Sequence, residues 1–309
     1  MRYICFILTI LIGSPAASFM QEMSEPLINY DLLTGIYLGQ TPPGSDPELF
    51  APGIISTNEG WEAAISFSPD FQELFFTRRA TIEGTENRIW YTRKIDGKWI
   101  EPKLAPFAKE YMEFEAFITP GGNKIIFSSD RPKPDGITYK GDIWYSEKTG
   151  SGWGEPKYLS KEINDGWAMF VTSTIDGTLY FTGGYNKKYG IFISKLVDGK
   201  YSEPEYLPEE INQSKYFGAS HPYIAPDESY LIFDAQPDGP AKTDLYISFR
   251  KLDGSWTKAV KFDTRINATK TEGIPSVSPD GKYLFFHRKN DVYWVSTSIF
   301  DELKSQNLK

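Results

Sequence analysis

Carboxylates and a histidine recur at fixed distances ahead of a series of tight turns, and side chains of these types can do chemistry together. Three glutamates each lie seven residues before the second residue of such a turn: Glu62, Glu113 and Glu272. Glu115 and His221 each lie five residues before an equivalent turn residue. Two carboxylates held roughly 5–10 Å apart are the machinery of most glycosidases. The spacing is therefore compatible with carbohydrate chemistry, provided that the fold brings these side chains together.

Two tryptophans share this pattern, because Trp61 and Trp167 each stand one residue before the seven-residue position of their own repeat. An indole ring offers a large apolar face with one polar edge, which suits a sugar ring or a peptide. We therefore predict a ligand-binding site made of seven residues: Trp61, Glu62, Glu113, Glu115, Trp167, His221 and Glu272.

A structural role explains the same residues. The tryptophans can pack between neighbouring repeats, and the glutamates can accept hydrogen bonds from loop amides. His221 precedes Pro222, which favours an extended backbone. If the glutamates instead form a ligand site, their clustered charges weaken folding. Replacing Glu62 and Glu272 by Gln would then leave stability unchanged or raise it.

Known catalytic motifs are absent from the sequence. It has no HExxH, no GxSxG and no glycine-rich phosphate loop, and it contains only 2 histidines. The second one, His287, stands in a repeat column with Thr77, Ser128, Thr182 and Asp234, and we expect it to be buried and hydrogen-bonded. We therefore assign no catalytic residue, no metal ligand and no cofactor.

The N-terminus has the pattern of a secretory signal. Arg2 precedes an apolar stretch from Tyr3 to Gly13, and small residues follow at Ser14, Ala16, Ala17 and Ser18. This predicts a cleavable signal peptide over residues 1–18, too short to span a bilayer. The single cysteine, Cys5, lies inside it, so the mature chain has no thiol and no cysteine for lipid attachment. We expect a periplasmic or secreted protein without a membrane span.

Composition narrows the classes further. Hydrophobic residues make up 40 % and aromatic residues 16 % of the 309 residues, which excludes a disordered chain. The formal net charge of −8 gives no electrostatic footprint for nucleic acid.

Five internal repeats must position the candidate residues. A tight turn recurs every 51–55 residues, with its second residue at Pro69, Pro120, Ile175, Pro226 and Pro279. Each turn is followed by a short apolar run that ends in an aromatic residue, and then by a second run such as DIWYS. Four copies continue through a glycine-containing turn into a final strand. Runs of this length, apolar on both faces, predict an all-β propeller of four-stranded antiparallel blades. Five blades fit best, or six if residues 28–46 add strands.

The fifth repeat ends without its last strand. Near the other end of the chain, PELFAP at 47–52 resembles EPKLAPF at 101–107, which ends the first complete repeat. We therefore predict that an N-terminal strand completes the last blade and closes the ring. The expected divisions are a signal peptide (1–18), a lead segment (19–46), the propeller (47–297) and a tail (298–309).

Strand order places the predicted site on one face of the ring. We name the strands of a blade A to D. The short A–B and C–D turns lie on one face, and the longer B–C loops and D–A connections lie on the other. Strand A lines the central channel and starts at the second face. We therefore expect the seven candidate residues at the channel mouth among these longer loops.

The repeats resemble a known family. The SPDG turn at 278–281 with its following LFF, the DIWYS segment and the GW-EP strand are similar to the TolB-like (WD-like) propeller repeat of bacterial exported proteins. The likeness covers about residues 40–297. It implies a propeller of the cell envelope, a fold that hosts binding modules, scaffolds and enzymes.

These observations lead to two functional hypotheses. The first is a monomeric envelope module, without a cofactor or a nucleic-acid partner, that binds a protein, a peptide or a polysaccharide at the channel mouth. The alternative is a carbohydrate-active enzyme of the glycosidase type that uses the channel-mouth carboxylates.

Overall fold

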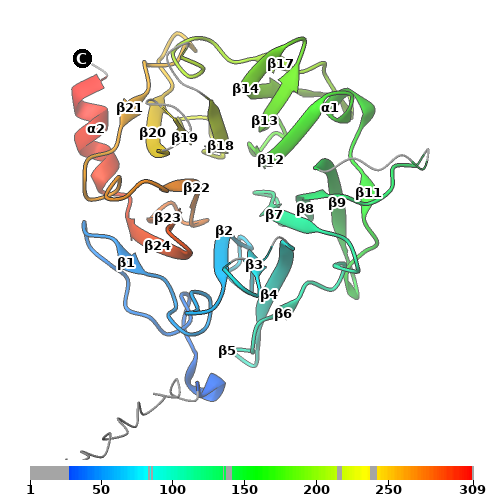
Figure 1. The fold of residues 1–309 in the computed structure, drawn as a ribbon, viewed down its shortest axis with the longest axis vertical. Helices are drawn as coiled ribbons and strands as arrows, with labels where there is room; N and C mark the ends of the chain where they lie inside the picture. The colour runs from blue at the N-terminus through cyan, green and yellow to red at the C-terminus, as the bar shows by residue number, and fades with distance from the viewer. Residues whose placement is uncertain are drawn as a thin grey trace, which may run out of the picture.

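The structure is a computed structural model that describes residues 28–307, apart from 83, 85, 135, 137–140, 214–217 and 237–241. The predicted signal peptide lies outside the described residues. Five antiparallel sheets stand around a central axis as the blades of a propeller, and Figure 1 views the ring along that axis. The predicted five-bladed fold is confirmed.

Blades are numbered here in chain order, and each runs outward from the channel. Blade 1 consists of β2 (Trp61–Phe67), β3 (Glu73–Arg79), β4 (Arg88–Ile95), β5 (Lys98–Trp99) and β6 (Lys103–Leu104). Blade 2 consists of β7 (Glu113–Ile118), β8 (Lys124–Ser129), β9 (Asp142–Thr149), β10 (Gly152–Trp153) and β11 (Lys157–Tyr158). Blade 3 consists of β12 (Trp167–Ser173), β13 (Leu179–Tyr185), β14 (Lys188–Ser194) and β17 (Glu205–Tyr206), with a hairpin of β15 (Leu196–Val197) and β16 (Lys200–Tyr201). Blade 4 consists of β18 (Ala219–Ile224), β19 (Tyr230–Ala235), β20 (Asp244–Phe249) and β21 (Val260–Lys261).

Blade 5 confirms the predicted closure of the ring. Its first three strands are β22 (Gly273–Val277), β23 (Tyr283–Arg288) and β24 (Asp291–Ser296), and its outer strand is β1 (Glu48–Leu49) from the N-terminal segment. Beside this pair, Phe50 is fully buried and its ring centre lies 5.2 Å from that of Trp294. The N-terminal segment therefore contributes both backbone pairing and core to the last blade.

A clamp that the sequence analysis missed ties the D–A connection to the third strand of the blade that it leaves. The side chain of Asn164 accepts a hydrogen bond from the backbone N–H of Ile143 at 2.8 Å and donates one to its carbonyl at 3.0 Å. The equivalent clamps are Asn212 on Ile191 and Asn267 on Leu245. Each asparagine follows an isoleucine in the D–A connection, so the repeated Ile-Asn dipeptide is a visible signal for these ties.

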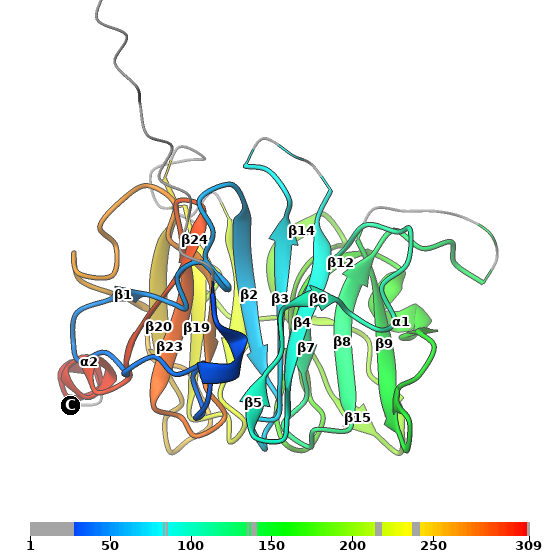
Figure 2. The same cartoon turned by 90° about the horizontal axis from the view of Figure 1, so that it is seen from below.

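The two faces differ as the strand order predicts. Figure 2 shows the ring edge-on, with the A–B turns and the β15–β16 hairpin on its lower face. Two helices lie outside the blades: α1 (Lys161–Asn164) precedes β12, and α2 (Ile299–Asn307) packs Phe300 against Tyr230 of blade 4. A short 3-10 helix, η1 (Tyr30–Leu32), begins the described chain. Within the described ranges, no helix is long and apolar enough to cross a membrane.

Candidate ligand site at the channel mouth

Each innermost strand carries one bulge at the same height in the channel. The pairing of strands A and B shifts register in every blade, and one residue inside each shift has a positive φ. These residues are Ala64 (φ 56°), Glu115 (59°), Phe170 (47°), His221 (47°) and Ile274 (52°). Positive φ is uncommon for non-glycine residues, and for a β-branched side chain such as Ile274 it is strained. The surrounding structure must therefore impose the bulge, which places five side chains around the axis.

Polar side chains of the second strands hold three of these five bulges. Thr77 of blade 1 accepts a hydrogen bond from the backbone N–H of Glu115 in blade 2, at 2.8 Å. In the same way, Thr182 accepts from the N–H of His221, and Asp234 accepts from the N–H of Ile274. Thr77, Thr182 and Asp234 of the repeat column recognised in the sequence thus link three of the blades to the next. Ser128 holds the same position in blade 2, and its Oγ has no hydrogen-bond partner among the described residues.

Glu115, His221 and Asp234 form a cluster across the channel. Nδ1 of His221 lies 2.7 Å from Oδ2 of Asp234, within blade 4, and Nε2 lies 3.6 Å from Oε1 of Glu115. Blades 2 and 4 are separated by blade 3, so the contact between Glu115 and His221 spans the central opening. The Glu115 side chain is 8 % exposed, and its Oε2 has no hydrogen-bond partner among the described residues. We call these three residues the channel-mouth cluster.

The two histidines have opposite electrostatic surroundings. Burial lowers the pKa of His221, but the charges and hydrogen bonds of Asp234 and Glu115 outweigh this effect and raise the pKa to about 10. His221 is therefore an imidazolium at neutral pH, held between the carboxyl groups of Asp234 and Glu115. Burial lowers the pKa of His287 to about 4, so this ring is neutral. Its Nδ1 donates to the carbonyl of Glu62 at 3.0 Å, in agreement with the predicted buried, hydrogen-bonded role.

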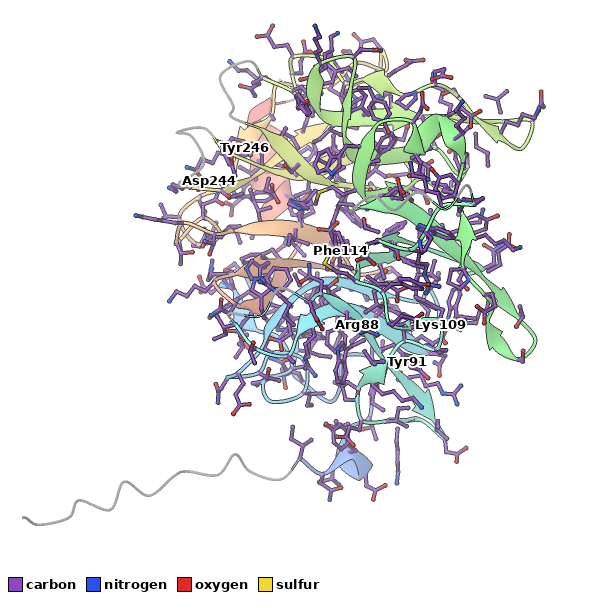
Figure 3. The ribbon with its side chains drawn as sticks, turned by 45° about the vertical axis from the view of Figure 1, so that its right-hand side comes forward. Arg88, Tyr91, Lys109, Phe114, Asp244 and Tyr246 are labelled. Atoms are coloured by element: carbon purple, nitrogen blue, oxygen red, sulfur yellow. The ribbon has the colours of Figure 1, made fainter. Side chains whose placement is uncertain are left out.

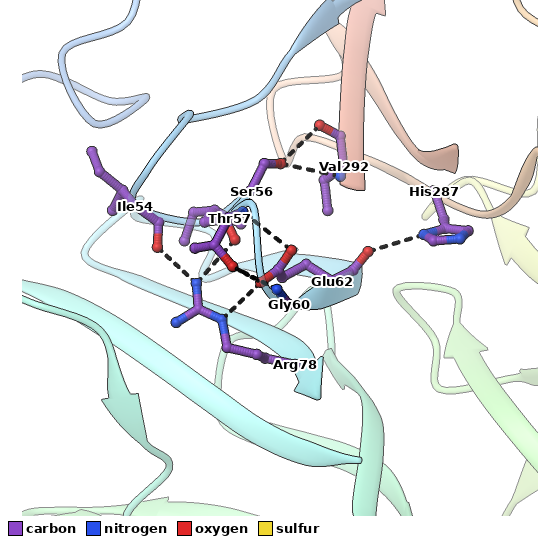
Figure 4. A network of polar contacts seen from close by, with 9 residues as sticks. Ile54, Ser56, Thr57, Gly60, Glu62, Arg78, His287 and Val292 are labelled. Atoms are coloured by element: carbon purple, nitrogen blue, oxygen red, sulfur yellow. Dashed lines mark hydrogen bonds and ion pairs between the residues drawn. The ribbon is translucent and has the colours of Figure 1, made fainter. Parts of the chain in front are cut away.

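The three repeat-equivalent glutamates have partners inside the protein. Glu62 is fully inaccessible to solvent, accepts a hydrogen bond from Thr57 and pairs with Arg78 at 3.0 Å. The same guanidinium donates to the carbonyls of Ile54 and Ile55, as Figure 4 shows for Ile54. Burial raises the pKa of Glu62, while Thr57 and Arg78 oppose that shift. The pair therefore fastens a D–A connection to its blade.

Glu113 and Glu272 repeat this arrangement. Arg131 donates from Nε to Glu113 at 2.7 Å and also binds the carbonyl of Phe107, while Arg288 lies 3.2 Å from Glu272 and binds two carbonyls of the preceding connection. Both carboxylates are fully inaccessible. Sequence reasoning found the glutamates but missed the arginines. The signal was an arginine two to four residues after the first apolar run of three repeats, as in LFFTR and LFFHR.

The tryptophans lie on the same face but in different surroundings. Arg79 lies over the Trp61 ring, 4.1 Å from its centre, and the His287 ring lies 4.8 Å from it on another blade. Trp61 thus packs between blades 1 and 5. Trp167 is 46 % exposed at the start of β12.

Figure 3 shows Phe114, next to Glu115 on β7, near the middle of the ring, with Tyr91 and Tyr246 on third strands farther out. The structure brings Glu115 and His221 together and keeps Glu62, Glu113 and Glu272 apart from them.

Asp234 is the member of the cluster that the predicted site lacked. Its position in the repeat column was visible, because a carboxylate replaces the hydroxyl of Thr77 and Thr182 there. In the part of the chain that the structure describes, no group of three His, Cys, Asp or Glu residues is arranged to hold a metal ion.

Comparison with known proteins does not identify a family for this chain. No family model matches the chain, and no curated protein matches it. Similar solved structures include a thermostable family-43 glycoside hydrolase, with 13 % identity over 78 % of this chain and 90 % of that one and a TM-score of 0.46. A gluconolactonase from Xanthomonas campestris has 12 % identity over 83 % and 96 % of the chains, with a TM-score of 0.45. An oligogalacturonate lyase in complex with manganese has 12 % identity over 76 % and 65 %, with a TM-score of 0.42. At these scores the likenesses carry no argument about function.

Proposed function

We propose that this chain is an exported binding or scaffolding propeller that holds the end of a polysaccharide or a peptide at its channel mouth. The observation that carries the proposal is Oε2 of Glu115, a buried carboxylate oxygen without a hydrogen-bond partner in the described structure, at the centre of the ring. An unsatisfied buried acceptor costs about 1–3 kcal/mol, and a ligand that donates a hydrogen bond to it recovers that cost.

The charges of the cluster define the group that it accepts. The His221 imidazolium is held by Asp234 and compensates one of the two carboxylates. The remaining negative charge favours a ligand group with hydrogen-bond donors, such as sugar hydroxyls or a peptide ammonium group. The exposed ring of Trp167 on the same face offers an apolar surface for the next part of the ligand.

Export and the resemblance to TolB-like repeats belong to the same proposal. The signal pattern at residues 1–18 supports secretion, and the in-phase repeat motifs support a relationship to envelope propellers. Both agree with a binding role in the periplasm or outside the cell.

A glycosidase-type activity is the alternative, because the channel mouth does hold two carboxylates, Glu115 and Asp234. Their arrangement favours binding instead. Both ring nitrogens of His221 lie toward these carboxylates, so the imidazolium stands where an inverting or retaining enzyme would need its substrate.

Screening by thermal shift against oligosaccharides and short peptides tests the proposal. A ligand that raises the melting temperature of the wild type should lose at least tenfold in affinity with Glu115→Gln, since a charge-assisted hydrogen bond is worth about 1.5–3 kcal/mol. Glu59→Gln, which changes an exposed glutamate, is the control. Turnover of an oligosaccharide that Glu115→Gln abolishes would favour the enzyme instead. A ligand bound equally by both variants would refute the mouth as its site.

A further inference from the structure

A cavity lies at the opposite end of the channel from the channel-mouth cluster, and it has no part in the function proposed above. It has a volume of about 260 Å³ and lies on the face of the A–B turns, enclosed by the ends of the A strands in blades 1, 2, 4 and 5. Four turn prolines lie at its edge: Pro69, Pro120, Pro226 and Pro279. Proline fixes φ, and each turn joins two paired strands, so this edge is formed before any ligand arrives. We call this cavity the turn-face pocket.

The wall of the pocket selects for an uncharged ring. Its apolar surface includes Phe117, Tyr223 and Val277, and no described residue that lines it carries a charge. A charged ligand would lose its hydration there without compensation. An apolar cavity of ~150 Å³ admits benzene. The larger volume here matches a fused bicyclic ring.

The Ser276 side chain in the wall lacks a hydrogen-bond partner among the described residues. Ser66 and Thr172 are repeat-equivalent, and each accepts a hydrogen bond from a backbone N–H of the next blade, at 2.8 Å from Ile118 and 3.2 Å from Ile224. Ser276 holds the same position in blade 5 and is 8 % exposed. Its Oγ has no hydrogen-bond partner in the described residues. Because Ser276 lines the pocket, rotation about its χ1 can turn the buried hydroxyl toward a ligand.

We propose that the turn-face pocket binds a small, uncharged, bicyclic aromatic molecule that forms one hydrogen bond with Oγ of Ser276 through a hydroxyl or N–H group. This proposal does not depend on a ligand at the channel mouth, because the two sites lie at opposite ends of the channel and share no residue.

Calorimetric titration of the full mature chain with three matched probes tests the proposal. The probes are 2-naphthol, naphthalene and 2-naphthoate, which share one ring system and differ in the polar group. The neutral rings should bind and the carboxylate should not. 2-Naphthol should bind about two- to tenfold tighter than naphthalene, which is the range of one net hydrogen bond. With Ser276→Ala this ratio should fall to about one, while naphthalene affinity is kept.

Two further variants locate the site and control for folding. Ser276→Leu should fill the pocket and abolish binding of both neutral probes, with retained circular dichroism as the check on folding. Ser66→Ala removes a hydroxyl from the same wall, but one that already has a partner, so the probe ratio should persist. Failure of both neutral probes to saturate the wild type would overturn the proposal. A probe ratio that survives Ser276→Ala would overturn it equally.

Discussion

Glu115 of blade 2 and His221 of blade 4 meet across the central channel, with Oε1 and Nε2 3.6 Å apart. Since blade 3 lies between blades 2 and 4, this contact crosses the central opening and connects two blades that are not neighbours in the ring. The imidazolium also holds Asp234. The charge state of one histidine therefore decides whether the two carboxylates at the centre of the fold have any counter-charge between them.

The stability that His221 contributes should depend on pH. Its pKa is raised from 6.5 to about 10 in the folded protein, so the contribution is fully present below about pH 6.5 and is lost as the pH rises through 10. The difference in unfolding free energy between wild type and His221→Gln should be a few kcal/mol near pH 6 and should shrink toward pH 10. Urea denaturation across this pH range measures it.

His287 provides the control for that experiment. Burial lowers its pKa to about 4 in the folded protein, and its ordinary pKa is 6.5, so between pH 8 and pH 10 the ring is neutral in the folded state and almost wholly neutral in the unfolded state. Any loss of stability in His287→Gln should therefore be constant over this interval. A constant difference for His221→Gln as well would show that the cluster is not charged as described.

The Glu62–Arg78 pair should be essential for folding. The sequence alone led us to expect that replacing Glu62 and Glu272 together by Gln would be neutral or stabilising, but the pairing of each with an arginine reverses the expected sign. Glu62→Gln alone leaves a mostly buried guanidinium without its counter-charge, which costs about 3–5 kcal/mol. Asp31→Asn, in the exposed pair with Lys98, should cost well under about 1 kcal/mol. Equal losses in chemical denaturation would refute the anchoring role.

The asparagine clamp gives a third test. Asn267 is 6 % exposed, and its Nδ2 donates to the carbonyls of Leu245 and Phe262. Asn267→Asp replaces this donor by an acceptor facing two carbonyls, so we expect a loss of about 2 kcal/mol or more in unfolding free energy. Asn123→Asp, at an exposed position, should change little. A melting temperature unchanged by Asn267→Asp would contradict the clamp.

Removal of the closing strand should abolish cooperative unfolding. Deletion of residues 19–53 takes away β1 and Phe50 and leaves the edge of β24 unpaired. A deletion that ends at residue 27, before the described chain begins, is the matched control. Calorimetry should show a single transition for the control and none for the longer deletion. A longer deletion that melts at the wild-type temperature would refute the role of β1.

Processing tests the proposed export. Intact-mass analysis of protein recovered from the periplasm or the medium should show cleavage near residues 16–20 and no acyl chain. Retention of Met1, or a lipid on the mature protein, would contradict it.

The repeat made the fold predictable, and the chemistry of the site was only partly so. Five copies of one turn, each followed by an aromatic-ended run, revealed the blades, and the missing strand of the fifth copy revealed the closure by β1. The pairing of Glu62 with Arg78 depends on register across two strands, which spacing along one strand does not show. Positive φ at Phe170 or Ile274 opposes the local preference of those residues, so only the folded ring reveals the bulge.

The bulges also affect how this ring can diversify. The five bulge positions, at one height of the channel, share a backbone conformation, yet their residues are alanine, glutamate, phenylalanine, histidine and isoleucine. At three of these positions, a side chain of the preceding blade accepts a hydrogen bond from the backbone N–H of the bulge residue. The neighbouring blade therefore fixes the backbone conformation there, and the position tolerates different side chains. Related rings could therefore acquire new specificities by exchanging these five residues, without any change in the blades that carry them.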